Sequence, residues 1–320
     1  ADRGFEVYLV EEKPFVGGHL GLLNELYWGR EASEMLASLV KRLSHPKIKL
    51  LTNSIIAEVK GYIGSFNVKV IQGPRYVNEN CNLCGRCEEV CPVSTPNRVN
   101  LGIDQRKAVY LPFPGCHPSQ YVVDREICNG CGDCLKVCDR KAINLLKEQD
   151  EIEMVVGTII VATGFEAYQP SEEFGYGDFK NVITQLALER VLSKNGPSKG
   201  RLTRPSDGRI PGRVAFIMCV GSRQENMGDL SEGKVNTYCS RFCCASAIKN
   251  ALILKERHSG VEVYVIYRDV RTFGRGQEDL FRKCREHGVI FVRYDPEQKP
   301  LVGMGENDDL VVEVKDILFG

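Results

Sequence analysis

Hydrophobic and polar positions in the first seventy residues follow the pattern of an α/β protein. Residues 5–10 form a β-rich run that ends in Glu11, and residues 31–43 repeat apolar side chains at helical spacing. Three further strands are predicted at residues 48–51, 55–59 and 66–71, with turn-forming residues between them. This part of the chain is therefore predicted to be one portion of an α/β domain.

A similar alternation returns after a cysteine-bearing block. Residues 154–162 are predicted to form a strand that leads into Thr163 and Gly164, and residues 181–192 a helix. A loop rich in Gly, Pro, Ser and Lys follows at residues 193–212. Later elements are predicted as strands at 214–218, 261–267 and 289–293 and as helices at 245–256 and 277–287. Two α/β stretches on either side of the cysteine block indicate an inserted domain.

Charge and hydropathy exclude several classes of protein. Lys plus Arg and Asp plus Glu both total 42, so the formal net charge is zero, which argues against a nucleic-acid binder or a polybasic membrane-associated protein. Apolar runs are far shorter than the roughly 20 residues of a transmembrane helix. No N-terminal signal is recognised, and a cytoplasmic location is expected. One basic-leaning stretch is predicted to be a solvated face, with Arg268, Asp269, Arg271, Arg275 and Arg282.

Cysteine changes the picture, because the chain has 14 of them in tight clusters. Two runs share the spacing Cys-x-x-Cys-x-x-Cys-x-x-x-Cys, and they comprise Cys81, Cys84, Cys87 and Cys91, then Cys128, Cys131, Cys134 and Cys138. This is the spacing of bacterial ferredoxins with two 4Fe–4S clusters, in which the fourth cysteine of each run binds the other cluster. One cluster is therefore assigned to Cys81, Cys84, Cys87 and Cys138, and the second to Cys128, Cys131, Cys134 and Cys91.

Structural zinc is the main alternative for these two runs. Zinc sites ordinarily use two Cys-x-x-Cys pairs, so a third cysteine three residues later would be surplus in both runs. Glycines at 85, 130 and 132 would allow each loop to curl around a cluster. The ligand arithmetic favours iron–sulfur.

A third cysteine group falls at the turn between the predicted strand 214–218 and the helix after it. In a nucleotide-binding βαβ unit this turn would be rich in glycine. Here it carries thiols, at Cys219, Cys239, Cys243 and Cys244. Cys239 and Cys243 are predicted to share a helical face, and a helix N-terminus stabilises thiolates. The group is predicted to hold a third cluster, with buried inert thiols as the alternative. Cys116 and Cys284 are predicted to be ordinary thiols.

Signals for a dinucleotide cofactor are individually weak. Glu11 ends a strand at the place where an acidic residue binds ribose hydroxyls. The pair Gly17 and Gly18 would let the backbone approach a cofactor, and Thr163 with Gly164 follows a predicted buried strand. A surface carboxylate and ordinary turns are the alternatives. The order of these features along the chain favours FAD.

Six segments together resemble HdrA, the flavin and iron–sulfur subunit of heterodisulfide reductase, over nearly the whole chain. They are VEEK with the paired glycines at 10–18, PRYV at 74–77, IIVATGF at 159–165, RPSDG at 204–208, VAFIMCVGSR at 214–223 and YCSRFCC at 238–244. The resemblance implies a thioredoxin-reductase-like (FAD/NAD-linked reductase) Rossmann-type α/β fold with an inserted two-cluster ferredoxin-like α+β domain. The expected domains are a flavin-binding portion at 1–73, the ferredoxin-type domain at 74–146, and the continuation of the reductase fold at 147–320, which includes a second Rossmann-like unit.

The same resemblance implies an oxidoreductase component that passes electrons between FAD and 4Fe–4S clusters, with flavin-based bifurcation as one form of that activity. Its implied partners are other heterodisulfide-reductase-like subunits, a ferredoxin or a hydrogenase or dehydrogenase electron donor, and further copies of itself in a larger complex. A passive iron–sulfur wire or scaffold is one alternative. A stand-alone NAD(P)H-dependent flavoprotein reductase is another, and it is disfavoured because no Cys-x-x-Cys lies outside the cluster runs.

Overall fold

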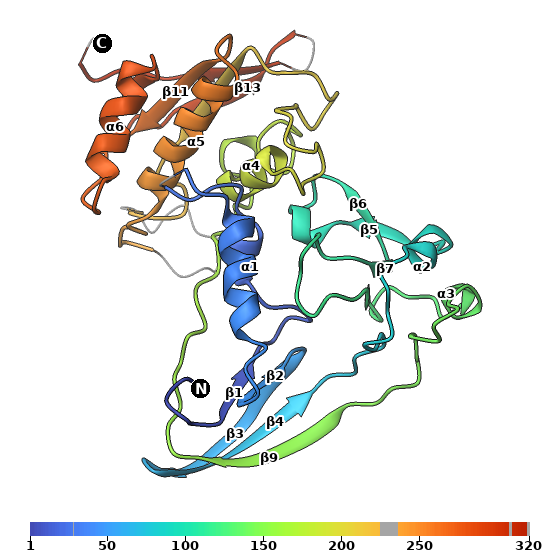
Figure 1. The fold of residues 1–320 in the computed structure, drawn as a ribbon. Coiled ribbons are helices and arrows are strands. Elements are labelled where there is room, and N and C mark those ends of the chain that lie inside the picture. The colour runs from blue at the N-terminus through green and yellow to red at the C-terminus, as the bar shows by residue number, and fades with distance from the viewer. Residues whose placement is uncertain (28, 225–235, 307–308, 319–320) are drawn as a thin grey trace. The chain divides into compact units, whose positions relative to one another are not determined.

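The structure is a computed structural model that describes residues 1–27, 29–224, 236–306 and 309–318 (Figure 1). It is a mixed α/β protein whose chain divides into two compact units. The first unit contains residues 1–24, 31–165 and 195–197, and the second contains residues 25–30, 166–194 and 198–320. None of the helices within the described ranges is both long and apolar enough to cross a membrane.

The first unit begins with a β-α-β arrangement. Strands β1 (Val7–Val10) and β2 (Ile48–Leu51) pair in parallel, and between them in the sequence lie the short 3-10 helix η1 (Gly18–Gly21) and helix α1 (Ala32–Arg42). Because the carboxyl ends of parallel strands share one edge, Glu11 follows β1 at the edge where β2 also ends. The predicted elements of this segment are confirmed.

A three-stranded antiparallel sheet completes this part, in the order β3 (Ser54–Tyr62), β4 (Ser65–Gln72) and β9 (Asp150–Val156). The register of β4 against β9 runs from Phe66 opposite Val156 to Gln72 opposite Asp150. The chain therefore leaves β4 and returns on β9 at directly paired positions, and residues 73–149 between them carry both four-cysteine runs (Figure 1).

The prediction of one strand over residues 154–162 is wrong. Strand β9 ends at Val156, and residues 157–162 have no strand structure. The partner strand β4 begins at Ser65, next to the hairpin turn, so no backbone of β4 remains to pair beyond Phe66. Ile160 is accordingly 86% exposed. The helix predicted from residue 181 begins later, as α4 (Gln185–Leu192), because the Thr184 side chain caps it by accepting a hydrogen bond from the Ala187 N–H.

Residues 73–149 contain only short elements, which surround a small apolar core. The helices are α2 (Arg86–Glu89), η2 (Arg98–Asn100) and α3 (Asp133–Lys136), and the strands are β5 (Ser94–Pro96), β6 (Gln105–Lys107), β7 (Val109–Tyr110) and β8 (Val122–Val123). Antiparallel pairs join β5 to β6 and β7 to β8. Their core is formed by apolar side chains that include Val77, Ala108, Val109, Ala142 and Ile143, together with buried cysteines.

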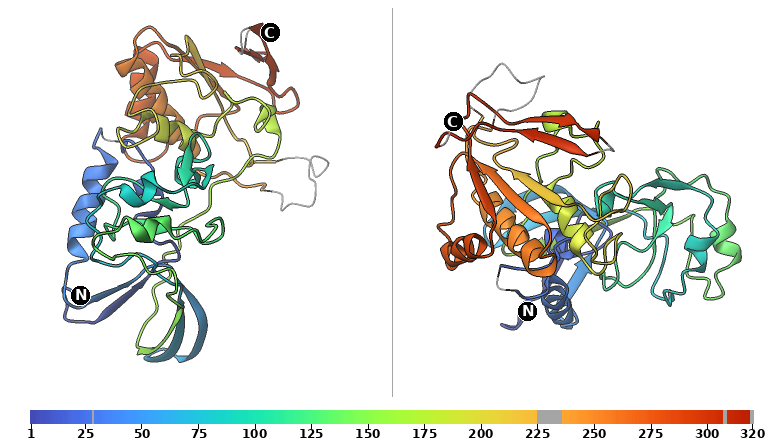
Figure 2. Two further views of the ribbon diagram at one scale, coloured as in Figure 1. Left: turned by 90° about the vertical axis from the view of Figure 1, so that its right-hand side faces the viewer. Right: turned by 90° about the horizontal axis from the view of Figure 1, so that it is seen from above.

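The second unit is built on a parallel three-stranded sheet in the order β10 (Arg213–Ile217), β11 (Glu262–Tyr267) and β12 (Ile290–Arg293). Helix α5 (Cys243–Arg257) connects β10 to β11, helix α6 (Gln277–Glu286) connects β11 to β12, and the two helices lie side by side (Figure 2). Buried apolar residues of α5 and β11 dominate the core, among them Ala247, Ala251, Leu254, Val263 and Val265. The remaining elements are η3 (Glu173–Gly175) and the hairpin of β13 (Leu301–Met304) with β14 (Leu310–Glu313).

A buried ion pair fastens α4 to α5. The Lys249 ammonium contacts the Glu189 carboxylate, and the two side chains are 5% and 1% exposed. The same ammonium donates a hydrogen bond of 2.7 Å to the Glu25 carbonyl oxygen. Burial lowers the pKa of Lys249, while the charge of Glu189 opposes that change. Such a pair is costly to break on one side, because the remaining charge stays buried.

Substitution of Lys249→Met is expected to lower the free energy of unfolding by about 3–5 kcal/mol, because the Glu189 carboxylate loses its buried cation. Urea denaturation of the purified protein measures this change. The matched control is Arg282→Met on α6, where the exposed ion pair with Glu286 should contribute little. Equal effects of the two substitutions would contradict the assigned role of the buried pair.

Candidate iron–sulfur and flavin sites

Cysteines from both runs line one pocket in the first unit. The pocket encloses about 390 Å³ of empty space, part of it open to solvent. Its cysteine lining is Cys81, Cys84, Cys87 and Cys138. These are three consecutive cysteines of the first run and the last of the second run. They are the same four residues that the spacing assigns to one cluster.

Electrostatics also bring these thiols together. Burial raises the pKa of the Cys87 thiol to about 12, and negative charge on Cys81 and Cys84 raises it further. Hydrogen bonds from the backbone and side chain of Arg86 instead lower the pKa of Cys84. The Cys138 sulfur accepts a hydrogen bond of 3.3 Å from the Ala142 N–H. These contacts leave soft sulfur ligands facing a common space.

The other four cysteines are gathered in the same manner. Burial raises the pKa of the Cys134 thiol, and three nearby thiolates raise it further; they belong to Cys128, Cys131 and Cys91. The Arg125 guanidinium lies 3.5 Å from the Cys128 sulfur. Cys91 thus approaches the loop of the second run, just as Cys138 approaches that of the first.

The two cysteine loops repeat one local structure. Gly85 and Gly132 occupy equivalent places after Cys84 and Cys131, and each has a left-handed backbone, with φ of 83° and 75°. Each glycine caps a single helical turn, α2 or α3, that presents the next cysteine of its run. In addition, Arg86 forms an ion pair with Asp139, which joins the end of the second run to the first loop.

Among the described residues, no three His, Cys, Asp or Glu side chains already form a site for a single metal ion. The assignment of clusters to these cysteines therefore rests on the pocket, the shared electrostatics and the spacing. The donor set suits iron–sulfur, because thiolates are the ligands of such clusters.

The third cysteine group lies at the carboxyl edge of the parallel sheet of the second unit. Cys219 follows β10 and has a left-handed backbone with φ of 65°. Cys243 and Cys244 are the first two residues of α5. A hydrogen bond from the Cys244 thiol is the largest influence that lowers the pKa of Cys243, to about 6, while negative charge on Cys243 contributes to a raised pKa at Cys219. Three of the four cysteines are thus close neighbours.

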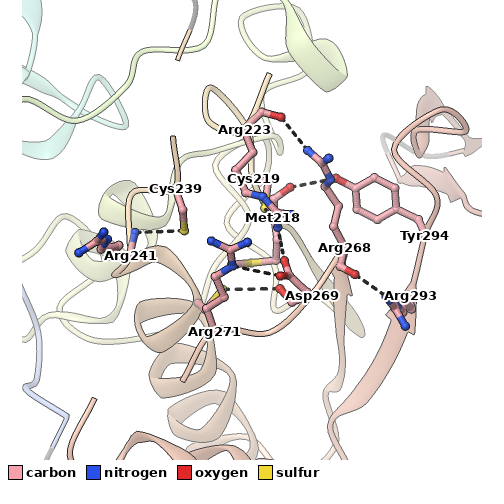
Figure 3. Close-up of polar contacts among 11 residues, drawn as sticks. Met218, Cys219, Arg223, Cys239, Arg241, Arg268, Asp269, Arg271, Arg293 and Tyr294 are labelled. Atoms are coloured by element: carbon pink, nitrogen blue, oxygen red, sulfur yellow. Dashed lines mark hydrogen bonds and ion pairs between the residues drawn. The ribbon is translucent and has the colours of Figure 1, made fainter. Parts of the chain in front are cut away.

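The predicted helical face shared by Cys239 and Cys243 is wrong. Helix α5 begins at Cys243 with Phe242 as its N-cap, and Cys239 precedes it without helical structure. Arg241 has a left-handed backbone with φ of 68°, which is incompatible with continuation of the helix. Cys239 instead turns back, and its sulfur accepts a hydrogen bond of 3.3 Å from the Arg241 N–H (Figure 3).

Sequence reasoning missed the charged residues around this group. The pattern predicts a solvated face for the stretch containing Arg268, Asp269 and Arg271, but the stretch follows β11 at the sheet edge and contacts the cysteines (Figure 3). The Cys244 thiol lies 4.0 Å from the Asp269 carbonyl oxygen, and the Arg271 backbone hydrogen-bonds the Cys244 sulfur. Their position directly after a strand of a parallel sheet was the signal available in the sequence.

The candidate flavin residues also converge in part. Gly17 and Gly18 have φ of 122° and 48°, and Gly164 has φ of 69°. The His19 ring stacks on the Phe165 ring at 4.4 Å between centroids, which brings the paired glycines close to Thr163 and Gly164. This stacking unites two segments that are far apart in the sequence.

Glu11 lies at the same end of the first unit. Its carboxylate accepts a hydrogen bond of 2.9 Å from the Lys13 N–H, and burial together with the charge of Lys13 lowers the pKa of His19. A side chain at Gly17 would meet Leu36 at 3.0 Å, so this position requires glycine in both conformation and space. An exposed carboxylate beside glycine backbones at a strand end is compatible with an adenine dinucleotide.

Comparison with known proteins supports the cluster assignment. Residues 74–96, which include the whole first run, match the family model of the 4Fe-4S binding domain. The chain is 42% identical over 328 residues to the HdrA-type subunit of H(2):CoB-CoM heterodisulfide,ferredoxin reductase from Methanothermobacter thermautotrophicus, covering 100% of the chain and 48% of that relative. It is 41% identical over 325 residues to the HdrA-type iron-sulfur subunit of CoB--CoM heterodisulfide reductase from Methanocaldococcus jannaschii, with the same coverage, 100% and 48%.

A further relative is the HdrA-type subunit of Ferredoxin:CoB-CoM heterodisulfide reductase from Methanosarcina mazei, which is 37% identical over 299 residues, or 92% of this chain and 37% of that protein. The chain thus spans about half the length of the first curated relatives it matches, which it covers to 48%. The match extends over the α/β segments as well as the cysteine runs. The chain therefore belongs to the HdrA family of heterodisulfide reductase subunits.

Proposed function

We propose that this chain is an electron-transfer portion of a heterodisulfide-reductase-like oxidoreductase, in which FAD exchanges electrons with 4Fe–4S clusters. The observation that carries the proposal is the pocket lined by Cys81, Cys84, Cys87 and Cys138. Its four sulfurs come from both runs, as in two-cluster ferredoxins. The companion set would be Cys128, Cys131, Cys134 and Cys91, which share one electrostatic environment.

A third cluster is proposed at Cys219, Cys239, Cys243 and Cys244. Support comes from the place of the group, at the carboxyl edge of a parallel β-α-β-α-β unit where ligands of such sheets bind. Cys243 has a pKa lowered to about 6, mainly by the Cys244 thiol, and so provides a thiolate at neutral pH. The unit is proposed to be Rossmann-like, with thiols at the place where a nucleotide would otherwise bind.

FAD is proposed to bind the first unit through Glu11, Gly17, Gly18, Thr163 and Gly164. The carboxylate of Glu11 would accept hydrogen bonds from ribose hydroxyls, while the glycine backbones would allow close approach of the cofactor. The domains are proposed as a flavin-binding portion at 1–73, a ferredoxin-type domain at 74–146 and a second reductase portion at 147–320. Pairing of Gln72 with Asp150 supports the insertion of the middle domain.

Together these cofactors would connect two kinds of redox chemistry. Flavin, when bound, exchanges either one or two electrons, whereas clusters pass single electrons. The names of the relatives mention hydrogen, ferredoxin and the CoB-CoM heterodisulfide. By similarity we propose partner subunits of a heterodisulfide-reductase-like complex, a ferredoxin or hydrogenase-type electron source, and electron bifurcation at the flavin.

Iron analysis of paired substitutions tests the crossed cluster assignment. Cys84→Ala is expected to remove about four irons per chain, the content of one cluster. Adding Cys138→Ala should remove no more, since both residues serve the same cluster. Adding Cys91→Ala to Cys84→Ala should instead remove about eight irons, because two clusters are then damaged.

The matched control is Cys116→Ala, which removes a buried cysteine outside every proposed ligand set. It should leave the iron content unchanged. A wild-type content near twelve irons supports the third cluster, and a content near eight contradicts it. Zinc in place of iron would contradict the cluster proposal altogether.

Glu11→Gln is expected to weaken FAD binding about tenfold or more, because a neutral amide accepts weaker hydrogen bonds than a carboxylate. Quenching of FAD fluorescence during titration into the anaerobic, reconstituted protein measures the affinity. The control is Glu12→Gln, the neighbouring exposed carboxylate. Equal affinities for the wild type and Glu11→Gln would contradict the proposed ribose contact.

A further inference from the structure

Arginine side chains surround the third cysteine group (Figure 3). The Arg223 guanidinium Nη1 lies 4.0 Å from the Cys219 sulfur. Arg271 lies beside Cys239, and its pKa is raised mainly by Asp269 and also by the Cys239 thiolate. Each arginine therefore faces a different proposed ligand of the same centre.

Asp269 holds the two arginines in place. Its carboxylate forms an ion pair with Arg223 and accepts a hydrogen bond of 3.0 Å from Arg271 Nε. Because the Asp269 carbonyl oxygen also lies 4.0 Å from the Cys244 thiol, the connection runs from ligand to aspartate to both cations. Charged groups fixed in this way need not reorient when charge changes beside them.

Backbone contacts fix the arrangement further. Arg268 Nη1 donates a hydrogen bond of 2.8 Å to the Arg223 carbonyl oxygen, and Arg293 Nε donates one of 3.0 Å to the Arg268 carbonyl oxygen. The Tyr294 hydroxyl donates to the Met218 carbonyl oxygen at 3.2 Å, just before Cys219. Residues at the carboxyl ends of all three strands of the parallel sheet thus converge on this group.

The charge balance of this environment differs from that of the first cysteine pocket. There, the Arg86 guanidinium is balanced by Asp139 in an ion pair. At the third group, Arg223 and Arg271 share the carboxylate of Asp269, so two cations are paired with one anion. Excess positive charge favours whichever state of a neighbouring centre is more negative.

We propose that Arg223 and Arg271, positioned by Asp269, raise the reduction potential of the centre held by the third cysteine group. This inference rests on the proposed function, since it requires a cluster at these cysteines. Uptake of one electron makes such a centre more negative by one charge, without a bond being formed or broken. The two guanidinium groups would stabilise that added charge and so favour the reduced state.

The test is a redox titration of the anaerobically reconstituted protein, followed by electron paramagnetic resonance. The signal of the third centre is identified as the one that Cys243→Ala abolishes. In Arg223→Gln and in Arg271→Gln, the midpoint of this signal should move to lower potential. A tenfold change in the equilibrium constant for one-electron reduction is expected, equivalent to about 59 mV. The midpoints of the other two centres should not move.

Arg213→Gln is the matched control. It removes the same charge from the same sheet, but at the amino ends of β10 and β11, where Arg213 pairs with Glu262. Its third-centre midpoint should equal that of the wild type. Arg223→Lys and Arg271→Lys retain the charge, so their midpoints should lie closer to the wild type than those of the glutamine variants.

Each result decides the inference. Unchanged midpoints in both glutamine variants would overturn it and leave the proposed third centre standing. Loss of the centre in the lysine as well as the glutamine variants would show that the arginines only maintain the fold, and would also overturn it. A wild-type protein with iron near eight and no signal abolished by Cys243→Ala would overturn the third centre and this inference together.

Discussion

Repulsion between thiolates gathered in a small space is the interaction on which the arrangement of this chain depends. Each cysteine group brings negative charge together in a partly buried place, and the pKa of Cys87 rises to about 12 mainly through burial. Thiols held in this way stay protonated unless cations offset the repulsion or metal replaces the protons. Loops that hold four cysteines together are therefore most stable with a positively charged partner, and iron provides one.

The two kinds of cysteine site achieve this gathering by different backbone means. In the inserted segment, single helical turns after Gly85 and Gly132 present the cysteines of each loop, while the last cysteine of each run approaches the other loop. In the second unit, the regular geometry of a parallel sheet places Cys219 and the start of α5 at one edge. Local turns suffice in the first case because the ligands are near in sequence. The second case needs a complete β-α-β framework.

Much of this could be predicted from the sequence. Periodicity located most helices and strands, and regular cysteine spacing identified the four residues that line the observed pocket. Errors arose where tertiary contacts override local pattern. Residues 157–162 are apolar enough for a strand but have no partner beyond Phe66, and Cys239 lies four positions before Cys243 without sharing its helix. The role of Asp269 was hidden for a similar reason, since Arg223, one of its two arginine partners, comes from a separate loop.

The direct pairing of Gln72 with Asp150 has a consequence for how such a protein can be rebuilt. Opposed residues in an antiparallel ladder lie only about 5 Å apart, a gap that a two-residue hairpin turn can close. The whole cysteine-bearing excursion is thus spliced into a sheet at one joint. Exchanging it for a plain turn, or for a cassette with other electron carriers, requires no change in the alignment of the flanking strands.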